Sequence, residues 1–216
     1  MKKLFVAAVA GLTVLAFAAV AAAALDPGVY DPGNTGCVKA TVTKNKTLHL
    51  EKNCPTPTDA AAGAEITGVN GQTFQSAEFT LASATQCGGG SPRFVVVAGG
   101  VVYHLGCANV TPTTNANGTV TYHIDAGTLA AAKQPIPTGT ISFVSILIDE
   151  QGVADITKIS FNGIAQKVVT NKNKGLTAPC KNGGWKTFTT PKFKNQGQCV
   201  SSMVHSRNAA KKTARG

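Results

Sequence analysis

The run Ile141–Ile148 constrains the fold more than any other stretch of this sequence. Its residues, ISFVSILI, are almost wholly apolar and rich in β-branched side chains, which favours a strand in the middle of a sheet over one wetted on one face. Such a strand needs a neighbour on each side, so other segments must pair with it. After the acidic turn Asp149–Gly152, alternation predicts a half-buried strand with Ile159 and Phe161 on the same face as Asp155.

Turn residues divide much of the chain into further short strands. Asn162–Gly163 between alternating residues predicts a type I′ hairpin, because both central positions of that turn need positive φ. Ser76–Ala82 and Thr119–Asp125 alternate as half-buried strands do. Helical character is confined to Ala126–Pro137, where prolines stop it early. A composition rich in Gly, Thr, Ala and Val completes the prediction of an all-β, antiparallel fold.

The N-terminal residues have the pattern of an export signal. Lys2 and Lys3 precede the apolar stretch Leu4–Val20, which runs into four alanines and then a Pro/Gly turn. We therefore predict a signal peptide over residues 1–24, cleaved after Ala24; a retained membrane anchor is the alternative. No later stretch is long and apolar enough to span a bilayer. The expected location is secreted or associated with the cell envelope.

Six cysteines agree with export, since an even number in an exported chain is typical of disulfides. Folding a hairpin about Asn45 sets Cys37 opposite Cys54 within a residue. A second cysteine pair brackets a hairpin that turns at Ala98–Gly100, and a third brackets the last module. The predicted disulfides are Cys37–Cys54, Cys87–Cys107 and Cys180–Cys199. Because the chain has no CxxC pair and no His at ligand spacing, no transition-metal site is predicted.

The first segment after the signal, LDPGVYDPGNTG, contains Asp-Pro-Gly twice and predicts two turns that lead into the sheet. Asp26 and Asp31 would also suit a structural calcium ion, although turn formation explains both without one. Beyond Cys54, a Pro/Thr/Ala-rich connector is expected up to Ala64. We predict no other cofactor.

No catalytic residues can be assigned. His49, His104 and His123 lie in alternating strands at positions expected to be surface or half-buried, and spacing identifies no carboxylate or nucleophile partner for them. Asp149 and Glu150 are adjacent and point in diverging directions, whereas a glycosidase needs two carboxylates across a cleft. A turn or a cation site is the favoured interpretation of this pair.

Charge is divided sharply along the chain. All ten acidic residues lie within residues 25–155, which carry six basic residues. Residues 156–216 contain twelve basic residues and no acidic one. The net charge of +10 is therefore a property of the C-terminal part, which suits an anionic partner.

The C-terminal part divides into a polar linker, residues 170–179, and a basic module with its tail, residues 180–216. The module begins CKNGGWKTFTTPKFKNQGQC, and twenty such residues need a disulfide and packed aromatic side chains to hold a structure. Positive charge beside an aromatic ring would suit acidic wall polymers, anionic lipid headgroups or nucleic acid, and export argues against the last. The residues expected to bind an anionic surface are Lys181, Trp185, Lys186, Lys192, Lys194, Arg207, Lys211 and Lys212. A solvated basic tail without a partner is the alternative.

Two resemblances accompany these patterns. Residues 180–188 and 193–200 resemble a short C-terminal motif of exported bacterial proteins, CKNGGWKxFxxFKNQGxCV, with a longer middle in this chain. The segment Phe79–Cys107, taken with the acidic turn and Asn162–Gly163, resembles a group of exported bacterial proteins over roughly Glu78–Gln166. The strand order there is similar to jelly-roll domains of the galactose-binding or carbohydrate-binding-module kind. That likeness implies a jelly-roll-like β-sandwich over residues 25–169.

Two classes of function fit these observations. The first is an exported, non-catalytic binding or cell-surface protein that binds carbohydrate or wall polymer and is retained at an anionic envelope by its basic tail. The second is an extracellular hydrolase that acts on polysaccharide. We favour the first, because the chain offers no nucleophile elbow, metal triad or paired carboxylates.

Overall fold

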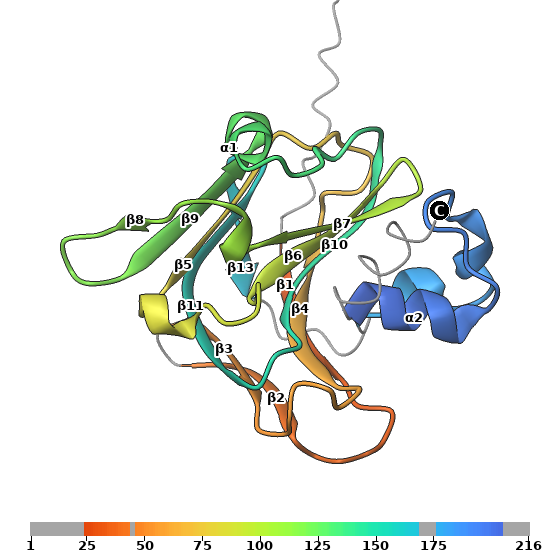
Figure 1. Ribbon diagram of the computed structural model, residues 1–216, viewed down its shortest axis with the longest axis horizontal. Helices are drawn as coiled ribbons and strands as arrows, with labels where there is room; N and C mark the ends of the chain where they lie inside the picture. The colour runs from red at the N-terminus through yellow and green to blue at the C-terminus, as the bar shows by residue number, and fades with distance from the viewer. Residues whose placement is uncertain (1–23, 44–45, 169–175, 205–216) are drawn as a thin grey trace, which may run out of the picture.

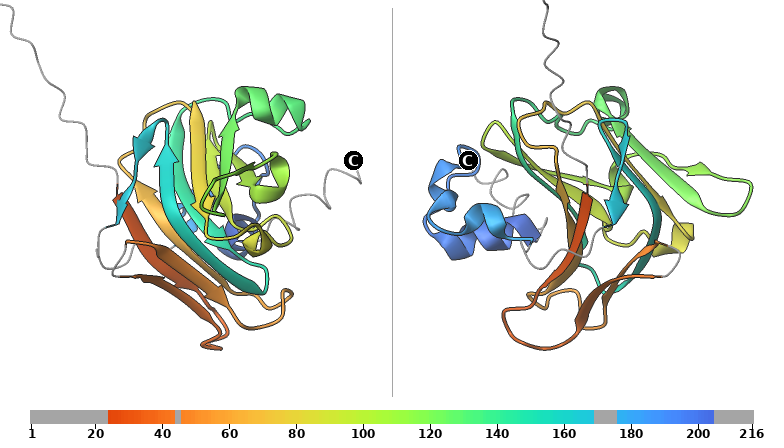
Figure 2. Two further views of the ribbon diagram at one scale, coloured as in Figure 1. Left: turned by 90° about the vertical axis from the view of Figure 1, so that its left-hand side faces the viewer. Right: turned by 180° about the vertical axis from the view of Figure 1, so that it is seen from behind.

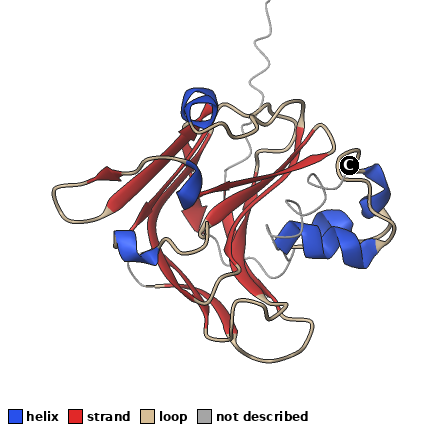
Figure 3. Ribbon diagram, viewed as in Figure 1, coloured by secondary structure: helices blue, strands red, loops and turns tan. Residues whose placement is uncertain are grey.

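The computed structural model describes residues 24–43, 46–168 and 176–204, which form two stacked antiparallel sheets and a small helical module (Figures 1 and 3). In spatial order, sheet A consists of β13 (Lys167–Val168), β1 (Ala24–Tyr30), β4 (Ala61–Thr67), β10 (Ile141–Ile148), β6 (Arg93–Ala98) and β7 (Val101–Gly106). Sheet B consists of β2 (Val38–Val42), β3 (Leu48–Lys52), β11 (Gly152–Phe161), β5 (Ser76–Leu81), β9 (Val120–Asp125) and β8 (Thr113–Thr114), with β12 (Ile164–Ala165) on β11. The prediction of an all-β sandwich is confirmed.

Strand β10 occupies the central position that its sequence predicts. It pairs with β4 on one side and β6 on the other, and seven of its eight residues are buried. The next strand, β11, lies in sheet B, so the turn after Ile148 carries the chain from one sheet to the other. Residues 141–161 are therefore a link between layers, not a hairpin within one sheet.

A β-bulge in β11 alters the faces predicted for this strand. Its pairing with β5 shifts register between Ile156 and Lys158. Before the bulge Ala154 and Ile156 face the core, and after it Ile159 and Phe161 do. Strict alternation assigned Asp155 to the buried face, and that was wrong because the extra residue resets the phase. The Asn162–Gly163 turn is confirmed, with φ of 51° and 74°.

Two strands lie where the sequence predicted turns and a connector. Residues 24–30 form β1 across the first Asp-Pro-Gly, and only the second, at Asp31, makes a turn. Residues 61–67 form β4, although the connector was expected to reach Ala64. Small residues are needed in β4, because a Cβ at Gly63 would lie 2.5 Å from the Ile146 carbonyl oxygen and 2.7 Å from Leu147 Cβ.

All three predicted disulfides are present. They join Cys37 to Cys54, Cys87 to Cys107, and Cys180 to Cys199. The first closes the β2–β3 hairpin, and the second closes the connections that flank β6 and β7. The predicted helix is α1 (Ala126–Ala131), whose N-terminus is capped by the Asp125 side chain. In the described part of the chain, no helix has the length and apolarity to cross a membrane.

The structure has two apolar clusters. The larger fills the space between the sheets and includes stacked and edge-on aromatic pairs such as Phe79–Tyr122 and Phe94–Phe161. The second lies on the outer face of sheet A, where the C-terminal module packs (Figure 2). The module comprises η3 (Ala178–Cys180), η4 (Gly184–Thr187) and α2 (Gln196–Val204). It is therefore held by the sandwich as well as by its own disulfide.

Candidate functional site

The C-terminal module is docked through a continuous apolar contact. Its buried apolar residues are Leu176, Cys180, Phe188, Cys199, Val200, Met203 and Val204. They pack on the outer face of sheet A, against Ala61, Val95, Val97, Phe143 and Leu147. Of the predicted linker, residues 170–175 lie outside the described residues, and Leu176, only 2% exposed, already belongs to the packed module. The module's orientation relative to the sandwich is thus defined by packing.

Arg93 connects this module to the interior of the protein. The side chain is 1% exposed, and its Nη1 donates to the Asp149 carboxylate and to Ser91 Oγ, 3.0 Å away. Its Nη2 donates to the Val204 carbonyl oxygen at 2.8 Å, in the last turn of α2. A cation at the C-terminal end of a helix donates to a carbonyl oxygen that lacks an intrahelical partner, and it interacts favourably with the helix dipole. The buried guanidinium of Arg93 therefore links the acidic turn at Asp149 to helix α2 of the module.

His104 contacts the same cluster and is half-buried, as its sequence position predicts. Its Nδ1 accepts a hydrogen bond of 3.3 Å from Arg93 Nε. Burial, followed by the charge of Arg93, lowers the pKa of His104 to about 3, with Asp149 opposing the shift in part. The imidazole is accordingly neutral at physiological pH. The alternation of β7 could not reveal this shift of the pKa, because Asp149 and Ser202, which also affect it, lie far along the chain.

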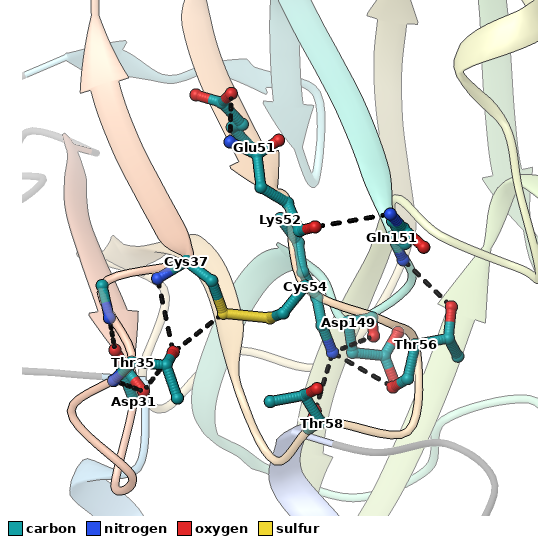
Figure 4. Close-up of a disulfide and its surroundings, with 12 residues drawn as sticks. Asp31, Thr35, Cys37, Glu51, Lys52, Cys54, Thr56, Thr58, Asp149 and Gln151 are labelled. Atoms are coloured by element: carbon teal, nitrogen blue, oxygen red, sulfur yellow. Dashed lines mark hydrogen bonds between the residues drawn. A yellow bond between two sulfur atoms is a disulfide. The ribbon is translucent and has the colours of Figure 1, made fainter.

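The acidic turn that begins at Asp149 also contacts a buried lysine, Lys52. Lys52 is fully buried, and its Nζ donates to the carbonyl oxygens of Thr56, Thr58 and Asp149 at 3.1, 2.8 and 2.7 Å (Figure 4). Three acceptors satisfy the three protons of the ammonium group. Asp149 thus contacts Lys52 through its backbone carbonyl and Arg93 through its carboxylate. Of the two interpretations considered for this pair of acids, a turn and a cation site, these contacts support the turn.

The two aspartates considered for calcium lie in different elements, Asp26 in β1 and Asp31 in the turn that follows it. The Asp31 carboxylate accepts from the backbone N–H groups of Thr35 and Gly36 at 3.0 and 2.7 Å, and these bonds lower its pKa (Figure 4). Asp26 lies in β1, paired in register with Glu65 of β4. Within the described ranges, no group of three or more His, Cys, Asp and Glu side chains is arranged to hold a metal ion.

The predicted anion-binding residues fall into two groups. The side chains of Lys181, Lys186, Lys192 and Lys194 are exposed on the module, whereas Arg207, Lys211 and Lys212 lie outside the described residues. The Lys186 Nζ lies 5.4 Å from the centroid of the Trp185 ring, within the range of a cation–π contact. Among the residues that the structure describes, none of the four lysines forms an ion pair. Their charge is therefore available to a ligand.

Sheet B carries two histidines, His49 and His123, whose carboxylate contacts were not identified from the sequence. His49 Nδ1 is 2.8 Å from Asp155 Oδ1, and His123 Nδ1 is 3.2 Å from Glu78 Oε2. These two partners come from neighbouring strands that are far apart in sequence, so the register reveals them. The other ring nitrogen of each histidine lies near a carboxylate two residues along its own strand: His49 Nε2 is 3.7 Å from Glu51 Oε2, and His123 Nε2 is 3.4 Å from Asp125 Oδ2. No Ser, Thr or Cys side chain of the described chain hydrogen-bonds either imidazole. A nucleophile–base pair is not formed here.

Comparisons with protein-family models, with curated proteins and with solved structures give no match for this chain. Its class is consequently defined by the structure alone. It is a disulfide-bonded antiparallel β-sandwich that carries a basic, disulfide-held module on the outer face of one sheet.

Proposed function

We propose that the protein is an exported, non-catalytic binding protein that is retained at the cell envelope by an anionic wall polymer. The lysines of the C-terminal module provide the binding surface. Three disulfides support export, because they form and persist mainly in oxidising compartments. Disulfides and a basic surface together suit a protein that works among anionic polymers outside the cytoplasm.

One observation carries the proposal: the four described lysines of the module are exposed and without ion pairs, on a scaffold that packing and a disulfide hold in place. Residues 156–216 contain no acidic side chain to compete for them. A fixed array of charges loses little conformational entropy when a polymer binds, since the backbone that presents it is already ordered. Trp185 adds a half-buried ring on which a sugar unit of the polymer can pack.

The docking of the module determines how the proposal is tested. Deleting the module would uncover the apolar outer face of sheet A, so charge substitutions are the cleaner perturbation. The test variant is K181Q/K186Q/K192Q/K194Q. The matched control, K39Q/K46Q/K133Q/K158Q, removes the same charge from exposed lysines of the sandwich.

Binding is measured by co-sedimentation with purified cell walls, and by titration with a polyphosphodiester and with polygalacturonate, across a series of salt concentrations. We expect the module variant to bind at least about tenfold more weakly at low salt, with a log–log salt slope shallower by roughly 0.7 for each lysine that contacts the polymer. The control should change less than about twofold, because charges distant from the ligand are screened. Equal weakening of the two variants would show that only net charge matters and would refute a binding surface on the module.

A further inference from the structure

The sequence contains four Asn-Gly pairs, which begin at Asn70, Asn117, Asn162 and Asn182. An asparagine before glycine can lose its side-chain amide, because glycine has no Cβ to hinder attack by its own backbone nitrogen on the asparagine Cγ. The reaction needs that nitrogen and the side-chain amide to be available at the same time. The surroundings of the four pairs differ in both respects.

In two of the pairs the glycine nitrogen is engaged. Gly71 N donates to the Ile141 carbonyl oxygen at 2.8 Å, and Gly118 N donates to the Asn115 carbonyl oxygen at 2.9 Å. The nitrogen must lose its proton before it attacks, so each attack would first break a backbone hydrogen bond. The asparagines of these two pairs, Asn70 and Asn117, are therefore protected.

The other two pairs have nearly the same turn geometry. Asn162 and Asn182 both have a φ of 51°, and the glycines that follow have φ values of 74° and 80°. Neither Gly163 N nor Gly183 N donates to a backbone carbonyl of another described residue. The backbone contribution to reactivity is thus matched, and the two sites differ in their side chains.

Hydrogen bonds hold the Asn162 side chain at both ends of its amide. Its Oδ1 accepts from the backbone N–H groups of Gln75 and Ser76 at 2.8 and 3.3 Å. Its Nδ2 donates to Gln72 Oε1 and to the Thr73 carbonyl oxygen at 2.9 and 2.8 Å. The amide cannot rotate towards Gly163 N without losing these bonds.

The Asn182 side chain has no such restraint. It is exposed and forms no hydrogen bond with another residue in the described part of the chain. Its turn is closed by Gly184 N, which donates to the Lys181 carbonyl oxygen at 2.9 Å, so closure of the turn does not use Gly183 N. Among the four pairs, Asn182–Gly183 therefore combines an available nitrogen with an available amide.

We propose that Asn182 is a site of deamidation through a cyclic imide. Hydroxide removes the proton from Gly183 N, which then forms a bond to Asn182 Cγ. The Cγ–Nδ2 bond breaks, and the nitrogen leaves as ammonia after taking a proton from water, which regenerates hydroxide. Water then opens the five-membered ring at either carbonyl and leaves aspartate or isoaspartate. The net reaction consumes one water and releases one ammonia.

The product introduces a negative charge into the basic module. Lys181 precedes Asn182 directly, and Lys186 follows in η4 beside Trp185. Residues 156–216 have no acidic side chain before the reaction. Deamidation therefore weakens the attraction of the module for an anionic polymer as the molecule ages, a consequence that rests on the proposed function.

The first test follows the reaction itself, by peptide mass spectrometry of the disulfide-bonded protein incubated in mildly alkaline buffer. We expect Asn182 to convert at least about tenfold faster than Asn162, because the Asn162 hydrogen bonds must break first. Asn70 and Asn117 should also convert more slowly than Asn182. In the reduced, urea-unfolded chain the four rates should lie within about threefold of one another, since the protection given by folding is gone.

The second test measures binding of the polyphosphodiester by N182D, which carries the charge of the product, and by N182Q, which keeps the amide. N182D should bind at least about threefold more weakly at low salt, with a log–log salt slope shallower by roughly 0.7. N182Q should remain within about twofold of the parent, because its charge is unchanged. If K181Q/K186Q/K192Q/K194Q bound the polymer as the parent does, the proposed function would fail, whereas conversion of Asn182 is measured by mass independently of any ligand.

Three outcomes would overturn the inference. Conversion of Asn182 no faster than that of Asn162 in the folded protein would show that side-chain hydrogen bonds do not select the site. An equal preference for Asn182 in the unfolded chain would assign the selection to neighbouring sequence instead of structure. Parent-like binding by N182D, together with weak binding by the four-lysine variant, would refute the effect of deamidation on the polymer.

Discussion

Replacing Arg93 with methionine tests whether one buried guanidinium fastens the module to the sandwich. The substitution leaves the Asp149 carboxylate buried at 3% exposure and takes a donor from the Val204 carbonyl. Removing one partner of a buried ion pair costs about 3–5 kcal/mol, because the other charge stays desolvated. We expect R93M to lower the free energy of unfolding by that amount, whereas K133M, at an exposed position, should change it by less than about 0.5 kcal/mol.

The assay follows two signals during urea unfolding with the disulfides intact. The chain has a single tryptophan, Trp185, which packs against the second apolar cluster, so its fluorescence reports the module. Far-ultraviolet circular dichroism reports mainly the two sheets. In the parent the two transitions should coincide, and in R93M the fluorescence transition should come at lower urea, because the module has lost its fastening to the interior.

The double variant R93M/D149L tests whether the instability of R93M comes from an unpaired buried charge on Asp149. It removes both charges, so the remaining cost is the unpaired Val204 carbonyl, about 1–3 kcal/mol. The double variant should therefore be more stable than the sum of R93M and D149L predicts, by at least about 2 kcal/mol. A loss below about 1 kcal/mol in R93M, or additive effects of the two single substitutions, would show that the pair does not hold the module.

Two further predictions concern burial. The pKa of His104 is about 3 in the folded protein and 6.5 for the exposed imidazole, so the unfolded chain binds a proton that the folded one does not. Stability should fall by up to about 1.4 kcal/mol per pH unit as pH drops from about 6.5 towards 3, and H104Q should remove that component of the pH dependence in urea titrations. Retention of the full slope in H104Q would contradict this. Substituting Gly63 with alanine should cost about 1–3 kcal/mol, because the new methyl group meets the Ile146 carbonyl and Leu147, whereas G28A, with open space around its Cβ, should be nearly neutral in thermal unfolding. Equal effects of the two glycine substitutions would show that backbone freedom, not crowding, decides the result.

The strands, turns and disulfides that depend on neighbouring residues could be predicted from the sequence. Alternation located β5 and β9, the apolar run located β10, and Asn162–Gly163 located its hairpin turn. The disulfides followed from hairpin register, since each pair brackets a local segment. These features share a cause: each is specified by residues within about twenty positions of one another.

Features that depend on distant segments could not be predicted in the same way. Nothing near Ile148 shows that the chain changes sheet there, because a turn between layers and a turn within a hairpin use the same residues. The strand through Pro27 exists because β4 pairs with it, against the turn preference of its sequence. Likewise, the pKa of His104 depends on contacts with Arg93, Asp149 and Ser202, of which Asp149 and Ser202 lie far along the chain.

For the candidate site, the sequence identified the module's lysines, and the structure confirms that the four in its described part are exposed. It did not identify the fastening of the module by Arg93, since an arginine at the start of an apolar strand resembles a solvated end residue.

The docking of the module constrains the order in which parts of the protein can fold. Val95, Val97, Phe143 and Leu147 form an apolar face on sheet A that, among the described residues, the C-terminal module covers. Because synthesis proceeds from the N-terminus, this face stays uncovered by the module until residues 176–204 have been made. The segment that begins at Cys180 therefore docks after the sandwich strands have been made. Until it docks, the outer face of sheet A exposes apolar side chains that can aggregate or bind a chaperone.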